Sequence, residues 1–320
     1  MTDQEWQLHP NEEELEFDLA QRVASLVSLR SQIPTDAFSA ESLGTERSGN
    51  GVVIESSGLI LTIGYLISEA ESIWITDEQG RVSQGMVTAY DQPSGFGLVQ
   101  SLASSDLPAI PLGDSTAIQP GEHVIVCGNG NDGQVINALV TAKREFAGYW
   151  EYVLDEAIFT APAHPNWGGA AMLNTKGELC GIGSLLVQQV TQTGETIAGN
   201  MMVPIDILKP VLEELKTSGR RNQQARPWMG MLIQESSDEL TVVSVHDQGP
   251  AQASGIQAED RIVALQGIRV DGLANLFRRV WDTGPAGCTL NFTIQRDDQL
   301  LEITLLTIDR SSRLKTGTVH

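Results

Sequence analysis

Residues 158–183 read IFTAPAHPNWGGAAMLNTKGELCGIG and contain the features that decide the fold. Apolar, strand-like runs alternate in this stretch with loops that contain glycine. The whole chain has the same character, with 31 glycines and only 5% aromatic residues, as is typical of many short strands joined by tight turns. We therefore predict a mainly β protein, and the length of 320 residues favours two domains.

Four segments upstream of this stretch follow one another in a recognisable order. They are Ser48-Gly49-Asn50-Gly51-Val52-Val53-Ile54 with Gly58-Leu59-Ile60-Leu61-Thr62, then residues 91–99, Leu112-Gly113-Asp114-Ser115 and residues 120–129. Together with 158–183 they resemble the motifs of trypsin-like serine proteases of the HtrA (Deg) type, and the likeness covers roughly residues 40–310. The resemblance implies a chymotrypsin/trypsin-like double six-stranded β-barrel.

The same alignment shows which residues stand at the catalytic positions. Trp167 occupies the position of the nucleophilic serine, Tyr65 that of the histidine and Gly95 that of the aspartate. Acyl transfer needs a hydroxyl or thiol beside a base that a third group orients. An indole N–H only donates, a phenol with a pKa near 10 is a poor base at neutral pH, and glycine has no side chain.

Pro165 is a fourth, independent change. The residue two before the nucleophile supplies one of the two oxyanion-hole N–H groups, and proline has none. We therefore predict a pseudoprotease with the degenerate triad positions Tyr65, Gly95 and Trp167 and the degenerate oxyanion position Pro165. The alternative is a serine-type endopeptidase-family hydrolase with an unconventional site. Cys127 and Cys180, on apolar runs, are more typical of small core residues than of nucleophiles, and we expect His164 to face solvent.

A second set of motifs follows residue 225. Arg226-Pro227-Trp228-Met229-Gly230-Met231 resembles the carboxylate-binding loop of HtrA PDZ domains, and residues 249–262 resemble the PDZ pattern downstream of it, with Glu259 in place of a glycine. Residues 273–281 would form the groove helix. The resemblance implies that a peptide C-terminus adds as a strand and that consecutive backbone N–H groups bind its carboxylate.

The peptide-binding residues that we predict are Trp228, Met229, Gly230, Met231 and Ile233. The backbone N–H groups of Met229, Gly230 and Met231 would bind the carboxylate. The side chains of Met229, Met231 and Ile233 would line the apolar side of a tolerant pocket. The alternative is that these side chains fill the core of the domain.

The N-terminal segment carries a different pattern. Asn11 followed by three glutamates is typical of a capped helix start, and Leu15, Leu19, Val23 and Val27 recur every four residues before Pro34. We predict an amphipathic helix whose apolar stripe either packs on its own barrel or mediates self-association. Because HtrA-type proteases commonly trimerise through this region, the resemblance implies a possible homo-oligomer, a trimer, or a hetero-oligomer with an active relative.

The motifs divide the chain into five parts. We predict an acidic N-terminal helical segment (1–40), the protease-fold domain (41–217), a polar linker (218–225), a PDZ domain (226–310) and a C-terminal tail (311–320).

Composition limits the partners and the location. The formal net charge of −21 argues against nucleic acid and anionic membranes, and indicates either simple solubility or a preference for basic partners. The sequence has no apolar span of about 18 residues, and residues 1–6 lack the features of a signal peptide. With three cysteines that show no paired spacing, these features predict a cytoplasmic protein. The five scattered histidines show no metal-ligand spacing, and we predict neither a metal nor another cofactor.

The sequence therefore predicts a catalytically inactive HtrA-like protein. Its PDZ domain would bind peptide C-termini or unfolded segments, in the role of a scaffold, a chaperone or a regulator.

Overall fold

The computed structural model describes residues 9–103, 107–129, 135–190, 194–237 and 239–315. The chain separates into two compact units. Unit 2 comprises Glu145–Asp155 and Gln223–Lys315, and unit 1 comprises the rest. No helix in the described ranges has both the length and the hydropathy needed to cross a bilayer.

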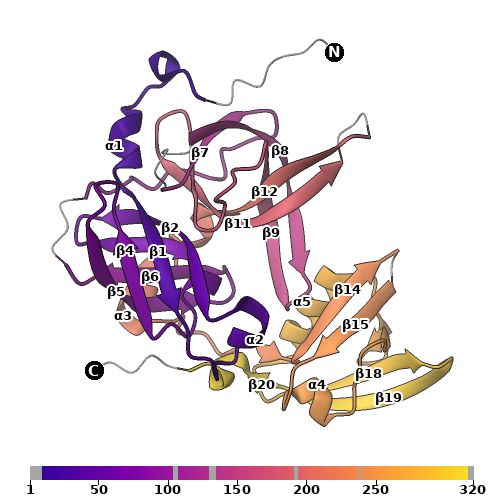
Figure 1. The fold of residues 1–320 in the computed structure, drawn as a ribbon. Coiled ribbons are helices and arrows are strands. Elements are labelled where there is room, and N and C mark those ends of the chain that lie inside the picture. The colour runs from indigo at the N-terminus through magenta and orange to yellow at the C-terminus, as the bar shows by residue number, and fades with distance from the viewer. Residues whose placement is uncertain (1–8, 104–106, 130–134, 191–193, 238, 316–320) are drawn as a thin grey trace. The chain divides into compact units, whose positions relative to one another are not determined.

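The described part of unit 1 folds into two closed antiparallel barrels (Figure 1). The first has the strand order β1-β2-β3-β6-β5-β4. Its strands are β1 (Leu26–Gln32), β2 (Glu46–Glu55), β3 (Leu59–Ile63), β4 (Ser72–Thr76), β5 (Val82–Asp91) and β6 (Phe96–Ser101). Every residue of β3 is buried, and Leu61 lies between Val52 and Leu98 on the neighbouring strands. The apolar runs of the sequence thus form the central strands, and burying each such side chain contributes about 1.5–3 kcal/mol.

The second barrel has the strand order β10-β11-β12-β9-β8-β7. Its strands are β7 (His123–Cys127), β8 (Val135–Gly148), β9 (Tyr152–Ala161), β10 (Ala171–Leu173), β11 (Leu179–Val190) and β12 (Thr196–Pro204). Val126, Ile158, Met172, Cys180 and Met202 meet in its buried core. The stretch 158–183 therefore contains the end of β9, all of β10 and the start of β11, and the predicted double barrel is confirmed.

Unit 1 also contains several short helices. They are the 3-10 helices η1 (Glu12–Glu14), η2 (Gly64–Leu66) and η3 (Ile205–Ile207) and the α-helices α1 (Leu19–Val23), α2 (Ala40–Leu43) and α3 (Leu212–Ser218).

The amphipathic helix predicted for the N-terminal segment is wrong over most of its length. Between residues 9 and 34, which the structure describes, the only helices are η1 and α1, and Leu26–Gln32 is the barrel strand β1, which pairs with β2 and β4. A spacing of four residues also fits the two-residue period of a strand, and the pairing of β1 on both edges satisfies its backbone. The segment does pack on its own domain, because Phe17 lies against Gly177.

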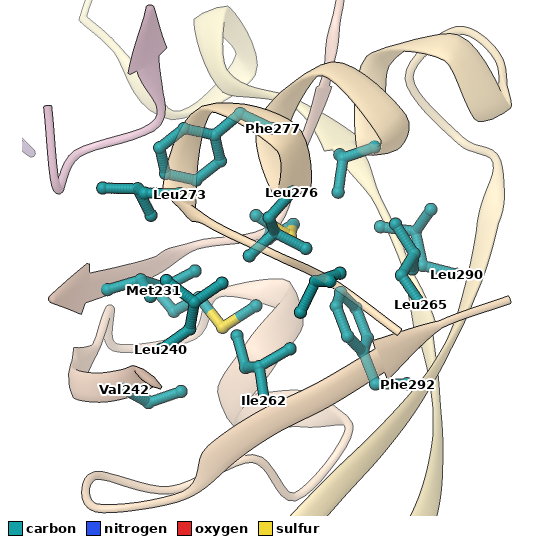
Figure 2. Close-up of a cluster of buried hydrophobic side chains, with 14 of the residues drawn as sticks. Met231, Leu240, Val242, Ile262, Leu265, Leu273, Leu276, Phe277, Leu290 and Phe292 are labelled. Carbon is teal, nitrogen blue, oxygen red and sulfur yellow. The ribbon is translucent and has the colours of Figure 1, made fainter. Parts of the chain in front are cut away.

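Unit 2 contains a sheet with the order β14-β15-β16-β18-β19, in which β14 is an edge strand. The elements are β13 (Pro227–Trp228), β14 (Met231–Ser236), β15 (Glu239–Val245), α4 (Pro250–Ala253), β16 (Arg261–Leu265), β17 (Ile268–Arg269), α5 (Leu273–Thr283), β18 (Thr289–Arg296), β19 (Gln299–Leu306), β20 (Ile308–Asp309) and η4 (Arg310–Arg313). Figure 2 shows Leu273, Leu276 and Phe277 of α5 packed toward Met231 and Phe292 of the sheet. The predicted groove helix is therefore α5.

Candidate functional site

The three residues at the triad positions lie together in unit 1. Tyr65 lies on η2, directly after β3, and Gly95 precedes β6. The backbone N–H of Gly64 donates to the carbonyl oxygen of Gly95 at 2.7 Å. Trp167, in the loop between β9 and β10, is hydrogen-bonded through its side chain to the phenol of Tyr65. The fold thus places these positions side by side, as a triad would require.

The hydrogen bonds of Tyr65 leave it without the properties of a general base. Its hydroxyl donates to the carbonyl oxygen of Ser184 at 3.0 Å. Burial raises the pKa of Tyr65 to about 12, against a smaller opposite effect of the hydrogen bond from Trp167. Arg47, itself buried, donates to the backbone oxygen of Tyr65 at 2.7 Å and holds the turn. The phenol is therefore neutral at physiological pH and already engaged as a donor.

The loop around Trp167 is held by a buried asparagine. Asn50 donates through Nδ2 to the carbonyl oxygens of Asn166 at 2.7 Å and Gly168 at 3.0 Å. Gly169 has φ +78°, and a Cβ there would lie 2.0 Å from the backbone oxygen of Asn50. Only glycine fits that position without a shift of the backbone. The double glycine of the sequence motif is thus explained by packing alone, independently of any nucleophile.

One expectation for the segment before Trp167, the exposure of His164, is wrong. His164 was predicted to face solvent, but its side chain is fully buried. Its Nδ1 accepts from the backbone N–H of Asn166 at 3.1 Å, and its own backbone N–H donates to Oδ1 of Asn200 at 2.6 Å. The imidazole therefore shapes the loop from inside. Pro165 follows on the surface and has no N–H to offer to an oxyanion.

Other potential nucleophiles and helpers are engaged elsewhere. Burial raises the pKa of both Cys127 and Cys180 to about 12, so neither forms a thiolate near neutral pH. Asp91 is buried and ion-paired with Arg221 at 2.7 Å, and it also accepts from Ser94. Among the residues that the structure describes, no group of three or more His, Cys, Asp or Glu side chains is arranged to hold a metal ion.

The predicted carboxylate-binding loop connects β13 to β14. The N–H of Met229 lies 3.1 Å from both carboxylate oxygens of Glu151, and the N–H of Gly230 donates to Oε1 of Glu151 at 2.9 Å. Gly230 has φ +76°, and a Cβ there would lie 2.9 Å from Pro250. The carboxylate that accepts from this loop belongs to the chain itself, because Glu151 lies between β8 and β9. Sequence reasoning missed Glu151, because nothing local marks a partner that lies 78 residues upstream of the loop.

The side chains predicted for the pocket are buried. Met229, Met231 and Ile233 are at most 1% exposed and belong to the unit 2 core, which also includes Val153 of β9. Trp228, 3% exposed, lies beside His246 with ring centroids 5.4 Å apart. In this structure the side chains of Met229, Met231 and Ile233 therefore fill the core of unit 2, which was the alternative expectation.

Comparisons with known proteins match two domain families to two successive parts of the chain. Residues 49–182 match the family described as trypsin-like peptidase domain, and residues 227–307 match the PDZ domain family. A probable periplasmic serine endoprotease DegP-like of Pseudomonas fluorescens is 29% identical over 80% of this chain and 55% of its own length. The corresponding protein of Pseudomonas putida is 29% identical over 84% of this chain and 58% of its own length. The chain thus spans about half the length of these relatives.

Solved structures show the same fold. The HtrA-type protease AlgW with a decapeptide superposes with a TM-score of 0.55 at 18% identity, covering 94% of this chain and 98% of that one. The serine endoprotease from Yersinia pestis gives a TM-score of 0.54 at 22% identity, covering 94% and 99%.

The names of the relatives contradict the predicted cytoplasmic location, because they are called periplasmic serine endoproteases. The cysteines were weak support for a reducing compartment. Cys127 and Cys180 are free but fully buried, and such thiols remain unpaired in any compartment.

With a trypsin-like peptidase domain followed by one PDZ domain, the chain is a homologue of the DegP/HtrA serine endoproteases.

Proposed function

We propose that this HtrA-like protein is catalytically inactive and that it binds peptide C-termini or unfolded segments through its PDZ domain. The observation that carries the proposal is the pair Trp167–Tyr65, in which an indole N–H is bonded to a phenol where a serine and a histidine would stand. Removing a nucleophile costs about 10⁶-fold in kcat in a comparable enzyme, and removing one oxyanion donor costs about 2.7–4 kcal/mol. The absence of both the nucleophile and this oxyanion donor supports a role as a scaffold, a chaperone or a regulator.

The PDZ part of the proposal is supported by the loop geometry. Two consecutive backbone N–H groups, those of Met229 and Gly230, converge on one carboxylate in a buried setting. A free peptide C-terminus carries the same group, and β14 is an edge strand beside which a peptide can add. Self-association as a trimer, or mixed assembly with an active relative, is part of the same proposal and is checked by native mass spectrometry.

The decisive experiment is to incubate the purified chain with a fluorophosphonate probe and, separately, with an unfolded protein substrate. An active HtrA protease serves as the positive control. We expect neither labelling nor cleavage, while immobilised C-terminal peptides retain the chain. Labelling or cleavage that persists after repurification would favour the alternative, a serine-type hydrolase with an unconventional active site. Failure to bind any peptide with a free C-terminus would contradict the PDZ part.

A further inference from the structure

The PDZ carboxylate-binding loop is already in contact with an acid of its own chain. We infer that Glu151 is an internal ligand of this loop, and that an incoming peptide C-terminus must displace the tip of the β8–β9 hairpin. This inference rests on the proposed peptide-binding function, whose regulation it specifies. It is argued within unit 2, which contains both the hairpin tip and the loop.

The carboxylate of Glu151 makes the contacts that a peptide terminus would make. Its two oxygens accept from the N–H of Met229, and Oε1 also accepts from the N–H of Gly230 at 2.9 Å. Glu151 is 5% exposed, so water does not compete for these donors. Two carboxylates cannot share the same N–H groups, and binding of a peptide terminus therefore requires Glu151 to leave.

The hairpin tip also uses the strand edge and the groove helix. The N–H of Ile233 on β14 donates to the carbonyl oxygen of Tyr149 at 3.0 Å, a bond of the kind that an added peptide strand would make. Val153 belongs to the buried core with Met231 and Ile233. Arg278 on α5 forms ion pairs with Glu145 and Asp155, one at each side of the tip. In Figure 1 the ends of β8 and β9 accordingly lie beside α5 and β14.

The backbone of Glu151 provides an independent argument. Its φ is +64°, in the left-handed region that costs a residue with a Cβ roughly 1–2 kcal/mol and that glycine adopts freely. A turn selected only for its shape would favour glycine or asparagine at this position. The bonds that the carboxylate of Glu151 accepts from Met229 and Gly230 offset this cost, and strained backbone of this kind can mark functional contacts.

The electrostatic setting shows why this internal ligand can be displaced. Burial opposes the negative charge and raises the pKa of Glu151 to about 7, although the N–H donors of residues 229–231 and the charge of Arg310 act in the opposite direction. The ion pairs of Arg278 are partly exposed, and such pairs contribute little. The ligand that fits is a peptide with a free C-terminal carboxylate and enough residues to replace the strand contact of Tyr149.

The test uses the full chain and the variant Glu151→Gly, which keeps the turn because glycine prefers its backbone conformation. The matched control is Glu156→Gln, an exposed acid on β9, the strand that follows Glu151. Amide hydrogen exchange at Met229 and Gly230 reports whether the loop is occupied. Fluorescence polarisation with a C-terminal peptide library, and with the same peptides amidated at the C-terminus, reports binding.

We expect faster exchange at both amides and about 10- to 100-fold tighter binding of free-acid peptides for Glu151→Gly, the range expected for removing a competing charged hydrogen-bond acceptor. Glu156→Gln should behave like the wild type, and amidated peptides should not bind. Unchanged exchange, or equal affinities of wild type and Glu151→Gly, would overturn the inference while leaving the proposed function standing. Faster exchange without peptide binding by either protein would contradict the proposed function and still support the internal carboxylate.

Discussion

An indole at position 167 changes the chemistry of the site but hardly disturbs its frame. The loop depends on the donors of Asn50 and on glycines that pass close to backbone atoms. A Cβ at Gly183, for instance, would lie 2.0 Å from the backbone oxygen of Trp167. None of these contacts needs the hydroxyl of a serine. The contacts that hold this loop therefore do not depend on which side chain stands at position 167.

Restoring the residue types of an active protease one step at a time tests whether the structure of this loop is independent of its reactivity. Trp167→Ser alone should not react with a fluorophosphonate, because Tyr65 cannot accept the proton of the hydroxyl. Adding Tyr65→His should produce slow labelling, and adding Pro165→Gly should raise the rate about 10²- to 10³-fold, because it supplies an N–H for the oxyanion. Gly95 is left unchanged, because its φ of +80° would strain a residue with a Cβ. Labelling rates measured by gel fluorescence check the series. Rapid labelling of Trp167→Ser alone would contradict it.

Tyr65 should contribute to stability. Tyr65→Phe removes the bond to the oxygen of Ser184 and the acceptor for the Trp167 indole. We expect a loss of about 1–3 kcal/mol in the free energy of unfolding, since each such bond contributes about 0.5–1.5 kcal/mol. Urea denaturation measures the change. The control is Tyr149→Phe, whose ring is 54% exposed and which should be nearly neutral. Equal effects of the two substitutions would refute the role of Tyr65.

The sequence located some residues of the site and misplaced others. The alignment of Tyr65, Gly95 and Trp167 with a triad depends on glycine-rich motifs beside them in the chain. In the structure Trp167 is hydrogen-bonded to Tyr65, and Gly95 is bonded to Gly64, the neighbour of Tyr65. His164 was assigned to the surface because proline and alanine surround it. Its burial depends on Asn200, a partner 36 residues away that no local pattern reveals.

The β8–β9 hairpin is the element in which pH should act. Glu151 has a pKa of about 7 when it occupies the loop and an ordinary value of 4.5 when released. The closed form therefore holds a proton that the open form loses, and closure weakens as pH rises from about 4.5 to 7. A free peptide carboxylate, with an ordinary pKa near 3.5, is ionised throughout this window before it binds.

Peptide affinity of the wild type should accordingly increase with pH, by up to about tenfold per unit within this window, and level off above pH 7. Fluorescence polarisation from pH 5 to 8 measures the profile. Glu151→Gly should give a flat profile, although it retains Arg310 and His246, the charged and titratable groups near the loop. A slope that survives in this variant would assign the effect to another group.

The elements that were predicted correctly came from the resemblance rather than from hydrophobic periodicity. It placed the groove helix at residues 273–281 and a hairpin over residues 48–62, where the structure has α5 and the strands β2 and β3. Strand β1 was taken for part of a helix, because apolar residues four apart satisfy both periods. The choice there depends on the edges of β2 and β4, which lie elsewhere in the sequence.

The whole molecule carries a formal net charge of −21, which should bias the choice of ligand. Peptides with lysine or arginine upstream of the C-terminus should bind about two- to tenfold more tightly than glutamate-substituted versions at 0.05 M salt. At 0.5 M salt the difference should largely vanish, because screening shortens the range of the field. Calorimetry at both salt concentrations checks this. A preference that is independent of salt would point to specific contacts.

Cutting the chain at the linker would change what the second unit can do. A fragment that begins at Gln223 lacks Glu145–Asp155 and thus leaves the donors of Met229 and Gly230 without their glutamate. Under the proposed competition by Glu151, a binding screen on such a fragment would report higher affinities for free-acid peptides than the intact protein has. Domain boundaries drawn at the linker would then omit the hairpin tip whose displacement we propose to limit peptide binding.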